Sequence, residues 1–287
     1  RGLGDVYKRQ HQCSEKYLLD RGHVDIKAQP AEGGFSTVLR DDTAQVDKKS
    51  VDRKLDDVVL GVHDNALTPR NEKLAGKEFD FLGKPGERFY HLPQTQNQHI
   101  IWPGYNTQDL DYSATKDNAV NLNLKPTSTP DGAEWGAFID ASHGKGFSVL
   151  ANSAAEDYTI ETNFAAHTHT HWAFSKPGVY TFEATYTATG KDGKELKSEP
   201  QTLTFAVGDK TLDSCSSHKP NDSEGETPSE RPDEKPDDAA KPEEPTGSSL
   251  SPWSLVLPAV LVVVFKAFYN FFRDNEDLIR RRFGLKF

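Results

Sequence analysis

The chain has 287 residues and a formal net charge of −10, with 44 acidic side chains against 34 Lys and Arg. Residues 221–250 account for seven of these net negative charges, so the remainder of the chain is near neutral. The sequence has no basic patch, and this argues against a nucleic-acid-binding protein.

The chain contains no Met. Residues 1–10 resemble the translated library-adapter sequence found at the ends of metagenomic reading frames. We therefore expect a non-native leader at 1–10 and a natural N-terminus that is missing, and these ten residues are excluded from the fold prediction.

Residues 11–210 carry short stretches of alternating apolar and polar residues, the pattern of half-buried β-strands. The interval 41–54 is charged and poor in apolar residues, so a long loop is expected there. No convincing amphipathic helix is found between His11 and Asp209. The prediction is all-β: an immunoglobulin-like antiparallel β-sandwich. Its clearest strands are predicted at 22–28, 35–40, 57–62, 119–125, 158–164, 180–187 and 201–207, with a hairpin formed by 135–140 and 146–150.

Three segments of different character follow the sandwich. Residues 211–251 are acidic and rich in Pro, with almost nothing apolar to bury, so a disordered stalk is predicted. Residues 252–272 combine an apolar run with an aromatic cluster and predict one transmembrane helix. The basic tail at 273–287 is expected in the cytoplasm by the positive-inside rule, with the sandwich outside the cell. An amphipathic C-terminal helix that does not span is the alternative.

The stretch 166–180 contains alternate histidines and carries the strongest chemical signal. On a single strand, His167, His169 and His171 would line one face about 7 Å apart. Trp172 and Phe174 would then anchor the opposite face in the core. Neutral imidazoles are common ligands of zinc and similar ions, so this row predicts a site for zinc or another divalent metal.

Further ligands must come from another part of the chain. His23 and Asp25 are also alternate residues on a predicted strand and are the best-placed candidates. His91, His99 and His143 are weaker candidates. The alternative is that the histidines form only the polar face of a sheet and bind no metal.

No catalytic motif is present: the sequence lacks His-Glu-x-x-His, Gly-x-Ser-x-Gly and a phosphate-binding glycine loop. We therefore expect that the protein is not an enzyme. The alternative is a zinc hydrolase, which would need an open coordination position and a base such as Asp25 or Glu161. Four aromatic residues could form a sugar or protein platform, or lie in the core: Trp102, Tyr105, Trp135 and Trp172.

The two cysteines, Cys13 and Cys215, flank the predicted sandwich. If the chain is extracellular, a disulfide bond between them would join the two ends of the domain. Two free thiols are the alternative.

Four motifs together resemble a known family: Gly22-His23-Val24-Asp25, Leu92-Pro93-Gln94-Thr95-Gln96, Trp102-Pro103-Gly104, and the stretch from His167 to Tyr180. The chain resembles the actinobacterial surface-anchored protein domain, also called the choice-of-anchor M domain, over about residues 18–208. The resemblance places the family's paired histidines on His167 and His169. His171 stands where the family often has Asn, so its role as a ligand is an additional prediction.

The resemblance implies a secreted protein held at the cell envelope, encoded beside metal-type ABC transporters with a substrate-binding lipoprotein. A sortase signal is absent, because Glu244-Pro245-Thr246-Gly247 lacks the leading Leu, so the plasma-membrane helix is the expected anchor. The preferred hypothesis is an extracellular protein that captures or delivers a divalent metal, zinc first, or a metal complex such as haem, with the transporter's binding protein as partner. The alternative is a structural or adhesive surface protein with no metal site.

Overall fold

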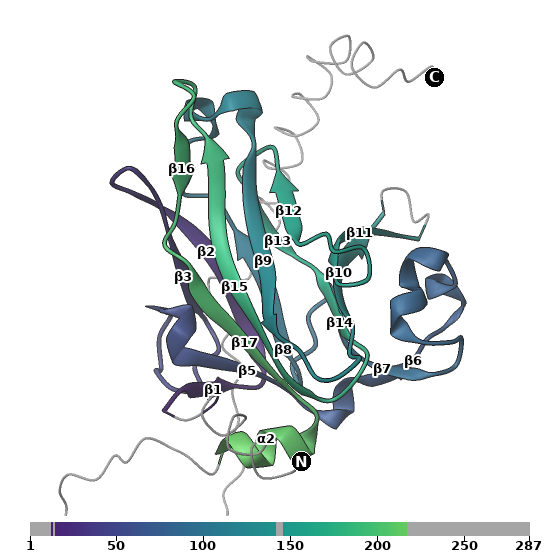
Figure 1. Cartoon of the computed structure of the whole chain (residues 1–287). Helices are drawn as coiled ribbons and strands as arrows, with labels where there is room; N and C mark the ends of the chain where they lie inside the picture. The colour runs from purple at the N-terminus through teal and green to yellow at the C-terminus, as the bar shows by residue number, and fades with distance from the viewer. Residues whose placement is uncertain (1–12, 14, 142–145, 217–287) are drawn as a thin grey trace, which may run out of the picture. The chain divides into compact units, whose positions relative to one another are not determined.

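The computed structural model describes Cys13 and residues 15–141 and 146–216, and these residues form mainly β-structure in two sheets (Figure 1). The larger sheet has twelve strands: β1 (Tyr17–Leu19), β2 (Gly22–Ala31), β3 (Gly34–Asp41), β4 (Val51–Arg53), β5 (Val58–Val62), β8 (Ile101–Asn106), β9 (Val120–Ser128), β12 (Thr159–Thr162), β13 (His167–His169), β15 (Gly178–Thr189), β16 (Glu195–Lys197) and β17 (Gln201–Val207). The smaller sheet has five: β6 (Leu67–Pro69), β7 (Arg88–Leu92), β10 (Trp135–Asp140), β11 (Phe147–Asn152) and β14 (His171–Phe174).

Helical structure is short and lies in the connections. The α-helix that the structure describes over its whole length is α2 (Asp209–Ser216). Six 3₁₀ turns accompany it in the same part of the chain: η1 (Leu55–Asp57), η2 (Asp64–Ala66), η3 (Glu72–Leu74), η4 (Lys77–Leu82), η5 (Tyr112–Ala114) and η6 (Lys116–Asn118). The prediction of an all-β domain is confirmed, and so is the hairpin, because β10 and β11 pair antiparallel. The predicted long loop at 41–54 is interrupted by β4, which pairs with β3.

The main core lies between the two sheets and is rich in aromatic rings. Trp135 of β10 meets Phe182 of β15 edge to face, with ring centroids 4.7 Å apart. Trp172 and Phe174 of β14 pack on Phe205 of β17 at 5.1 and 5.0 Å. These rings alternate along their strands with residues facing away from the core, so the period-two pattern gives each sheet an apolar inner face. Trp135 and Trp172 are therefore core residues and not a surface platform.

The prediction of a purely antiparallel sandwich is wrong. Among the described strands, the pairs β1–β5, β5–β17, β2–β8 and β3–β16 are parallel. Parallel neighbours require a long crossover connection, and the chain between β2 and β8 passes through β3 to β7 before it returns. Alternation within a strand reveals which face is buried but not the direction of the neighbouring strand, so this topology was not visible in the pattern.

The predicted histidine strand is divided between the two sheets. β13 pairs with β8 in the larger sheet, whereas β14 pairs with β10 and β7 in the smaller sheet. The chain changes sheets at Thr170, which is buried. All four residues of β14 are buried, because the sandwich core covers one face and a second cluster, which includes Phe79, Phe89 and Phe138, covers the other. His171 therefore does not continue the row of His167 and His169.

The predicted disulfide bond joins the two ends of the domain. Cys13 and Cys215 form a disulfide bond with a Cα–Cα distance of 5.1 Å. Cys215 lies on α2, which extends to Ser216. The prediction that the disordered stalk begins at residue 211 is therefore wrong, because residues 211–216 are helical. The leader 1–10 and residues 217–251, 252–272 and 273–287 lie outside the described residues. Among the residues that are described, no helix has the length and apolar character needed to span a membrane.

His63 attaches α2 to the sandwich. Its Nδ1 lies 2.7 Å from Oδ1 of Asp209, and its Nε2 lies 3.2 Å from Oδ2 of Asp20. Burial acts to lower the pKa of His63, but the hydrogen bonds to Asp209 and Asp20 outweigh it, so the pKa is raised. The hydrogen bond from His63 lowers the pKa of Asp209. The imidazole of His63 thus lies between two carboxylates and secures the start of the helix.

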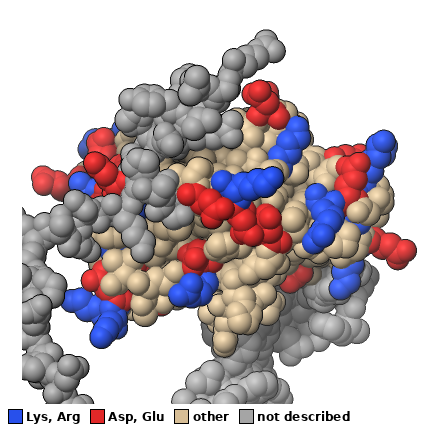
Figure 2. All heavy atoms as spheres, turned by 90° about the horizontal axis from the view of Figure 1, so that it is seen from below, with Lys and Arg blue, Asp and Glu red and all other residues tan. Residues whose placement is uncertain are grey.

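Figure 2 shows the molecule from below in the view of Figure 1, the side on which α2 lies. On the described part of the face that it shows, Lys and Arg side chains are interspersed with Asp and Glu and form no basic patch. This distribution agrees with the absence of a nucleic-acid-binding charge pattern in the sequence.

Candidate metal centre

Three adjacent strands, β2, β8 and β13, carry the candidate ligands. β8 lies in the middle, parallel to β2 and antiparallel to β13. The register places Asp25 on one side of Gly104 and His169 on the other. His23 lies two residues before Asp25 and His167 two residues before His169, so both pairs project from the same face of the sheet. The structure therefore brings together four of the five predicted ligands: His23, Asp25, His167 and His169.

Gly104 provides the space in which the two flanking strands' side chains meet. A Cβ atom at this position would lie 2.6 Å from Oδ1 of Asp25 and 2.9 Å from the backbone oxygen of Thr168. It would also lie 3.0 Å from Cε1 of His169. Because the middle strand has no side chain here, Asp25 and His169 reach one another across it. The glycine is therefore part of the site's architecture.

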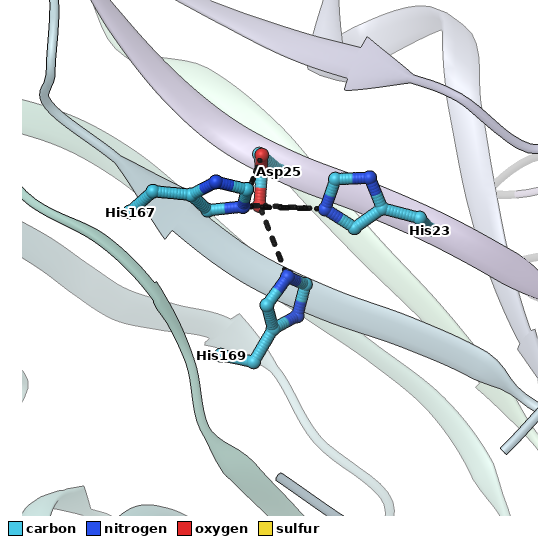
Figure 3. A group of neighbouring side chains, drawn as sticks. All are labelled: His23, Asp25, His167 and His169. Atoms are coloured by element: carbon cyan, nitrogen blue, oxygen red, sulfur yellow. Dashed lines mark hydrogen bonds and ion pairs between the residues drawn. The ribbon is translucent and has the colours of Figure 1, made fainter. Parts of the chain in front are cut away.

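The ligand atoms converge on one point (Figure 3). Nε2 of His167 lies 2.9 Å from Oδ2 of Asp25, and Nε2 of His23 lies 3.4 Å from Oδ1. The two Nε2 atoms of His23 and His167 are 3.3 Å apart, and Nε2 of His169 lies 3.8 Å from Oδ1 of Asp25. The last distance is too long for a hydrogen bond. Among the described residues, this buried Nε2 has no hydrogen-bond partner.

The electrostatics of Asp25 and His169 suit metal binding. Burial raises the pKa of Asp25, but the hydrogen bond from His23 and the charges of the surrounding imidazoles outweigh it, so the pKa is lowered. Burial lowers the pKa of His169 to about 4, although the carboxylate of Asp25 acts in the opposite direction. The hydrogen bond to Asp25 raises the pKa of His23. At neutral pH Asp25 is therefore ionised and His169 neutral, which are the states that bind a metal ion.

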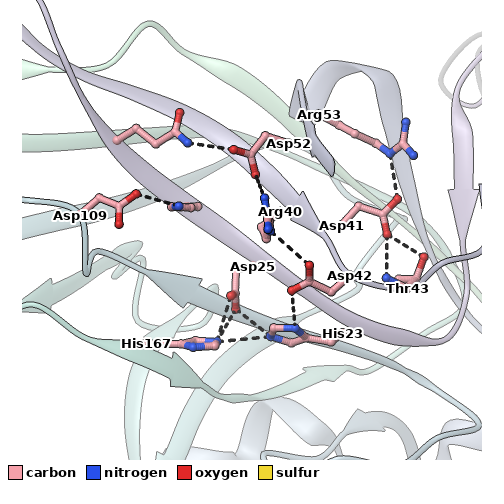
Figure 4. A network of polar contacts seen from close by, with 12 residues as sticks. His23, Asp25, Arg40, Asp41, Asp42, Thr43, Asp52, Arg53, Asp109 and His167 are labelled. Atoms are coloured by element: carbon pink, nitrogen blue, oxygen red, sulfur yellow. Dashed lines mark hydrogen bonds and ion pairs between the residues drawn. The ribbon is translucent and has the colours of Figure 1, made fainter. Parts of the chain in front are cut away.

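Asp42 orients His23 from outside the cluster (Figure 4). Nδ1 of His23 donates to Oδ2 of Asp42 over 3.0 Å, which leaves Nε2 directed at Asp25. Nε of Arg40 donates to the other oxygen of Asp42 over 3.1 Å. A carboxylate on the second ring nitrogen fixes the tautomer of a metal-binding histidine. Sequence reasoning missed Asp42 because it lies in the interval predicted as a loop.

Trp102 supports His169 from the neighbouring strand. The two rings stack with centroids 3.4 Å apart and an interplanar angle of 8°. The indole Nε1 of Trp102 donates to the backbone oxygen of Gln94 over 2.9 Å, which fixes the ring. The sequence offered Trp102 as a surface platform or a core residue, and the structure places it against a candidate ligand.

His171, the fifth predicted ligand, lies in a different environment. Its Nδ1 accepts a hydrogen bond from the backbone nitrogen of Gln94 over 3.1 Å and lies 2.9 Å from Nε2 of His91. Its ring stacks on Phe138 at 4.7 Å. Burial lowers the pKa of His171, and burial lowers that of His91 to about 4. The prediction that His171 joins the metal cluster is wrong, because the change of sheet at residue 170 carries it to the smaller sheet.

The remaining candidates lie elsewhere. His99 is exposed and lines a cavity of about 390 Å³ beside His63. Glu161 is exposed on β12, where it pairs with Asn121 of β9. His143 lies outside the described residues.

The chain matches no protein-family model and no curated protein sequence. The four-residue geometry is therefore the main basis for a functional proposal.

Proposed function

We propose that the protein binds a divalent transition-metal ion, zinc in the first place, through His23, Asp25, His167 and His169. One observation carries the proposal: the separations of Asp25 from the three imidazole nitrogens and of His23 from His167 run from 2.9 to 3.8 Å, and all four ligand atoms lie within 4.8 Å of one another. Four ligands placed tetrahedrally at the usual zinc distances would be about 3.3 Å apart. The ligand atoms are therefore already arranged around a position of suitable size.

The donor set supports zinc over the alkaline-earth ions. Three imidazole nitrogens and one carboxylate suit zinc and related transition metals, whereas magnesium and calcium select oxygen donors. All four donor atoms lie within 4.8 Å of one another. This compactness favours a bare ion over haem, whose iron takes protein ligands above and below a wide ring. Four protein ligands also leave no open coordination position, so binding is favoured over hydrolysis.

The cellular setting is a second part of the proposal. We propose that the domain is a member of the surface-anchored family, with its β-sandwich held outside the plasma membrane by a disordered stalk and a C-terminal helix. It would deliver its ion to the binding protein of an ABC transporter. Support comes from the motif resemblance, from the composition of residues 211–287, and from the Cys13–Cys215 disulfide, which is typical of an oxidising compartment.

The test is zinc-dependent stabilisation of the full chain. A ligand that binds only the folded state at about 100 times its Kd adds about 2.7 kcal/mol to the free energy of unfolding, a rise in thermal midpoint of about 5 to 10 °C. We expect this rise in the wild type and in His171→Ala, but not in His169→Ala. His99→Ala is the control for the loss of an exposed imidazole.

The absence of a rise in the wild type at millimolar zinc would contradict the proposal. The histidines would then be a polar sheet face, and a structural or adhesive role would become the leading hypothesis. A rise lost equally in His171→Ala and His169→Ala would instead indicate that zinc binds by a different set of ligands.

A further inference from the structure

The four ligands differ in their access to solvent. The side chain of Asp25 is 1% exposed and that of His169 is 9% exposed. The side chain of His23 is 19% exposed, whereas that of His167 is 33% exposed. The cluster is therefore closed at Asp25 and His169 and opens to solvent beside His167.

The ligands also differ in what holds them from outside the cluster. His23 is fixed by Asp42, and His169 is stacked on Trp102. Asp25 is buried against Gly104. His167 differs from them: within the described residues, the hydrogen bonds and ring contacts of its side chain are all to the other three ligands.

His167 also lies on a strand that, in the described part of the chain, is paired on one side only. It is the first residue of β13, a three-residue strand at the end of the strand order of the larger sheet. Within the described residues, β13 pairs with β8 alone. An edge strand with hydrogen bonds on one side moves at lower cost than a strand paired on both sides. The adjoining segment before β13 includes Phe164, which is 70% exposed.

We propose that His167 is the exchange ligand of the site, through which the ion enters and leaves, while His23, Asp25 and His169 remain in place. This inference rests on the proposed metal-binding function. The incoming ligand is a neutral nitrogen donor that reaches the ion from the solvent side of His167, and free imidazole serves as its probe. Its neutral nitrogen forms a bond to the ion as the bond to the neutral nitrogen of His167 breaks, so the charge of the site is unchanged and no electron is transferred.

The proposal predicts an asymmetry that free imidazole can reveal. Removal of the His167 side chain leaves a coordination position open to solvent, so added imidazole can occupy it. Removal of the His169 side chain leaves a position enclosed by Trp102 and the backbone around Gly104, and imidazole from solvent cannot enter it. Rescue should therefore occur at position 167 and not at position 169.

The experiment uses zinc and the full chain, with a chromogenic chelator to measure zinc affinity and dissociation rate. His167→Ala should lower the affinity and accelerate dissociation at least about tenfold, and millimolar imidazole should reverse most of both changes. His169→Ala should lose affinity without recovery, and His169→Gln should behave in the same way. His99→Ala should match the wild type with and without imidazole.

The outcomes separate this inference from the proposed function. If wild-type protein binds no zinc, the proposed function itself fails. If wild-type protein binds zinc but folded His167→Ala shows no recovery with imidazole, His167 is not the exchange ligand and the binding function stands. Equal recovery of His167→Ala and His169→Ala would also overturn the inference, because the site would then be open on both sides.

Discussion

The indole of Trp102 lies flat against the imidazole of His169, with ring centroids 3.4 Å apart. Stacking of this kind contributes about 1 kcal/mol beyond the area buried, and it holds the nitrogen of His169 toward Asp25. We expect Trp102→Ala to weaken zinc binding about fivefold and Trp102→Phe to retain most of the affinity, measured by isothermal titration. Equal affinity in wild type and Trp102→Ala would show that the stack does not position the ligand.

Gly104→Ala should disrupt the site more severely. The new methyl group would overlap Asp25 and the backbone of Thr168, so the two flanking strands would have to separate. We expect zinc affinity to fall by more than the roughly 10- to 100-fold that loss of an outer partner causes. Gly190→Ala is the matched control, because its methyl group would come within 3 Å of the flexible carboxylate of Asp192 alone. Retention of affinity in Gly104→Ala would contradict the three-strand geometry.

Asp42→Asn tests the orientation of His23. The amide can no longer supply the negative charge that holds the Nδ1 proton, so we expect zinc affinity to fall about 10- to 100-fold. Asp52→Asn provides a close comparison, because Asp52 contacts the same Arg40 but does not contact His23. A chelator competition assay on both variants measures the difference. Equal losses would assign the effect to Arg40 and not to His23.

The contacts of His63 with Asp20 and Asp209 should make the stability of the domain depend on pH. Because the folded pKa of His63 is raised, its contribution is complete below the unfolded value of about 6.5 and is lost as pH rises through the folded value. Because the folded pKa of Asp209 is lowered, its contribution is lost as pH falls through that value. The difference in thermal midpoint between wild type and His63→Gln should therefore be largest in mildly acidic solution.

The measurement compares thermal midpoints of the two proteins across the acidic and alkaline ranges without added metal. Arg21 and His99 also line the cavity beside His63, and both are unchanged in the variant. A difference that stays constant from acidic to alkaline pH would show that protonation of His63 is not linked to folding.

Loss of the Cys13–Cys215 bond should destabilise the domain strongly. The bond closes a loop with a sequence separation of 202, for which the chain-entropy model gives about 5 kcal/mol. We expect the double Cys→Ser variant to unfold at a lower denaturant concentration than the oxidised wild type, and reduced wild type to behave like the variant. Zinc affinity should change little, since the three strands of the site do not include either cysteine. Identical unfolding curves would contradict this expectation.

Local alternation was sufficient to predict most of the strands that form the core. The sequence pattern of β15 and β17 gave their faces correctly because each has one face in the aromatic core. The same reasoning identified His23 with Asp25, and the row of His167, His169 and His171, as candidate ligands, and the family resemblance singled out His167 and His169. It could not show that both pairs converge, because this depends on β8 lying between strands far apart in the chain.

His171 shows where the pattern fails. Its spacing from His169 is that of one continuous strand, but a strand buried on both faces has no polar side, and β14 is such a strand. Asp42, in contrast, was open to prediction. The turn at Gly33 pairs Ala31 with Gly34, and the same register continues to Val24 and Asp41. One further step places His23 beside Asp42.

The disulfide has a mechanical consequence. Cys13 and Cys215 lie at the two ends of the described domain, and their bond bridges them directly. A pulling force applied between these two points would pass through a pair of sulfur atoms and bypass the sheets. The hydrogen bonds that hold β2, β8 and β13 in register would then carry no tension, and the spacing of the four ligands would be preserved under load.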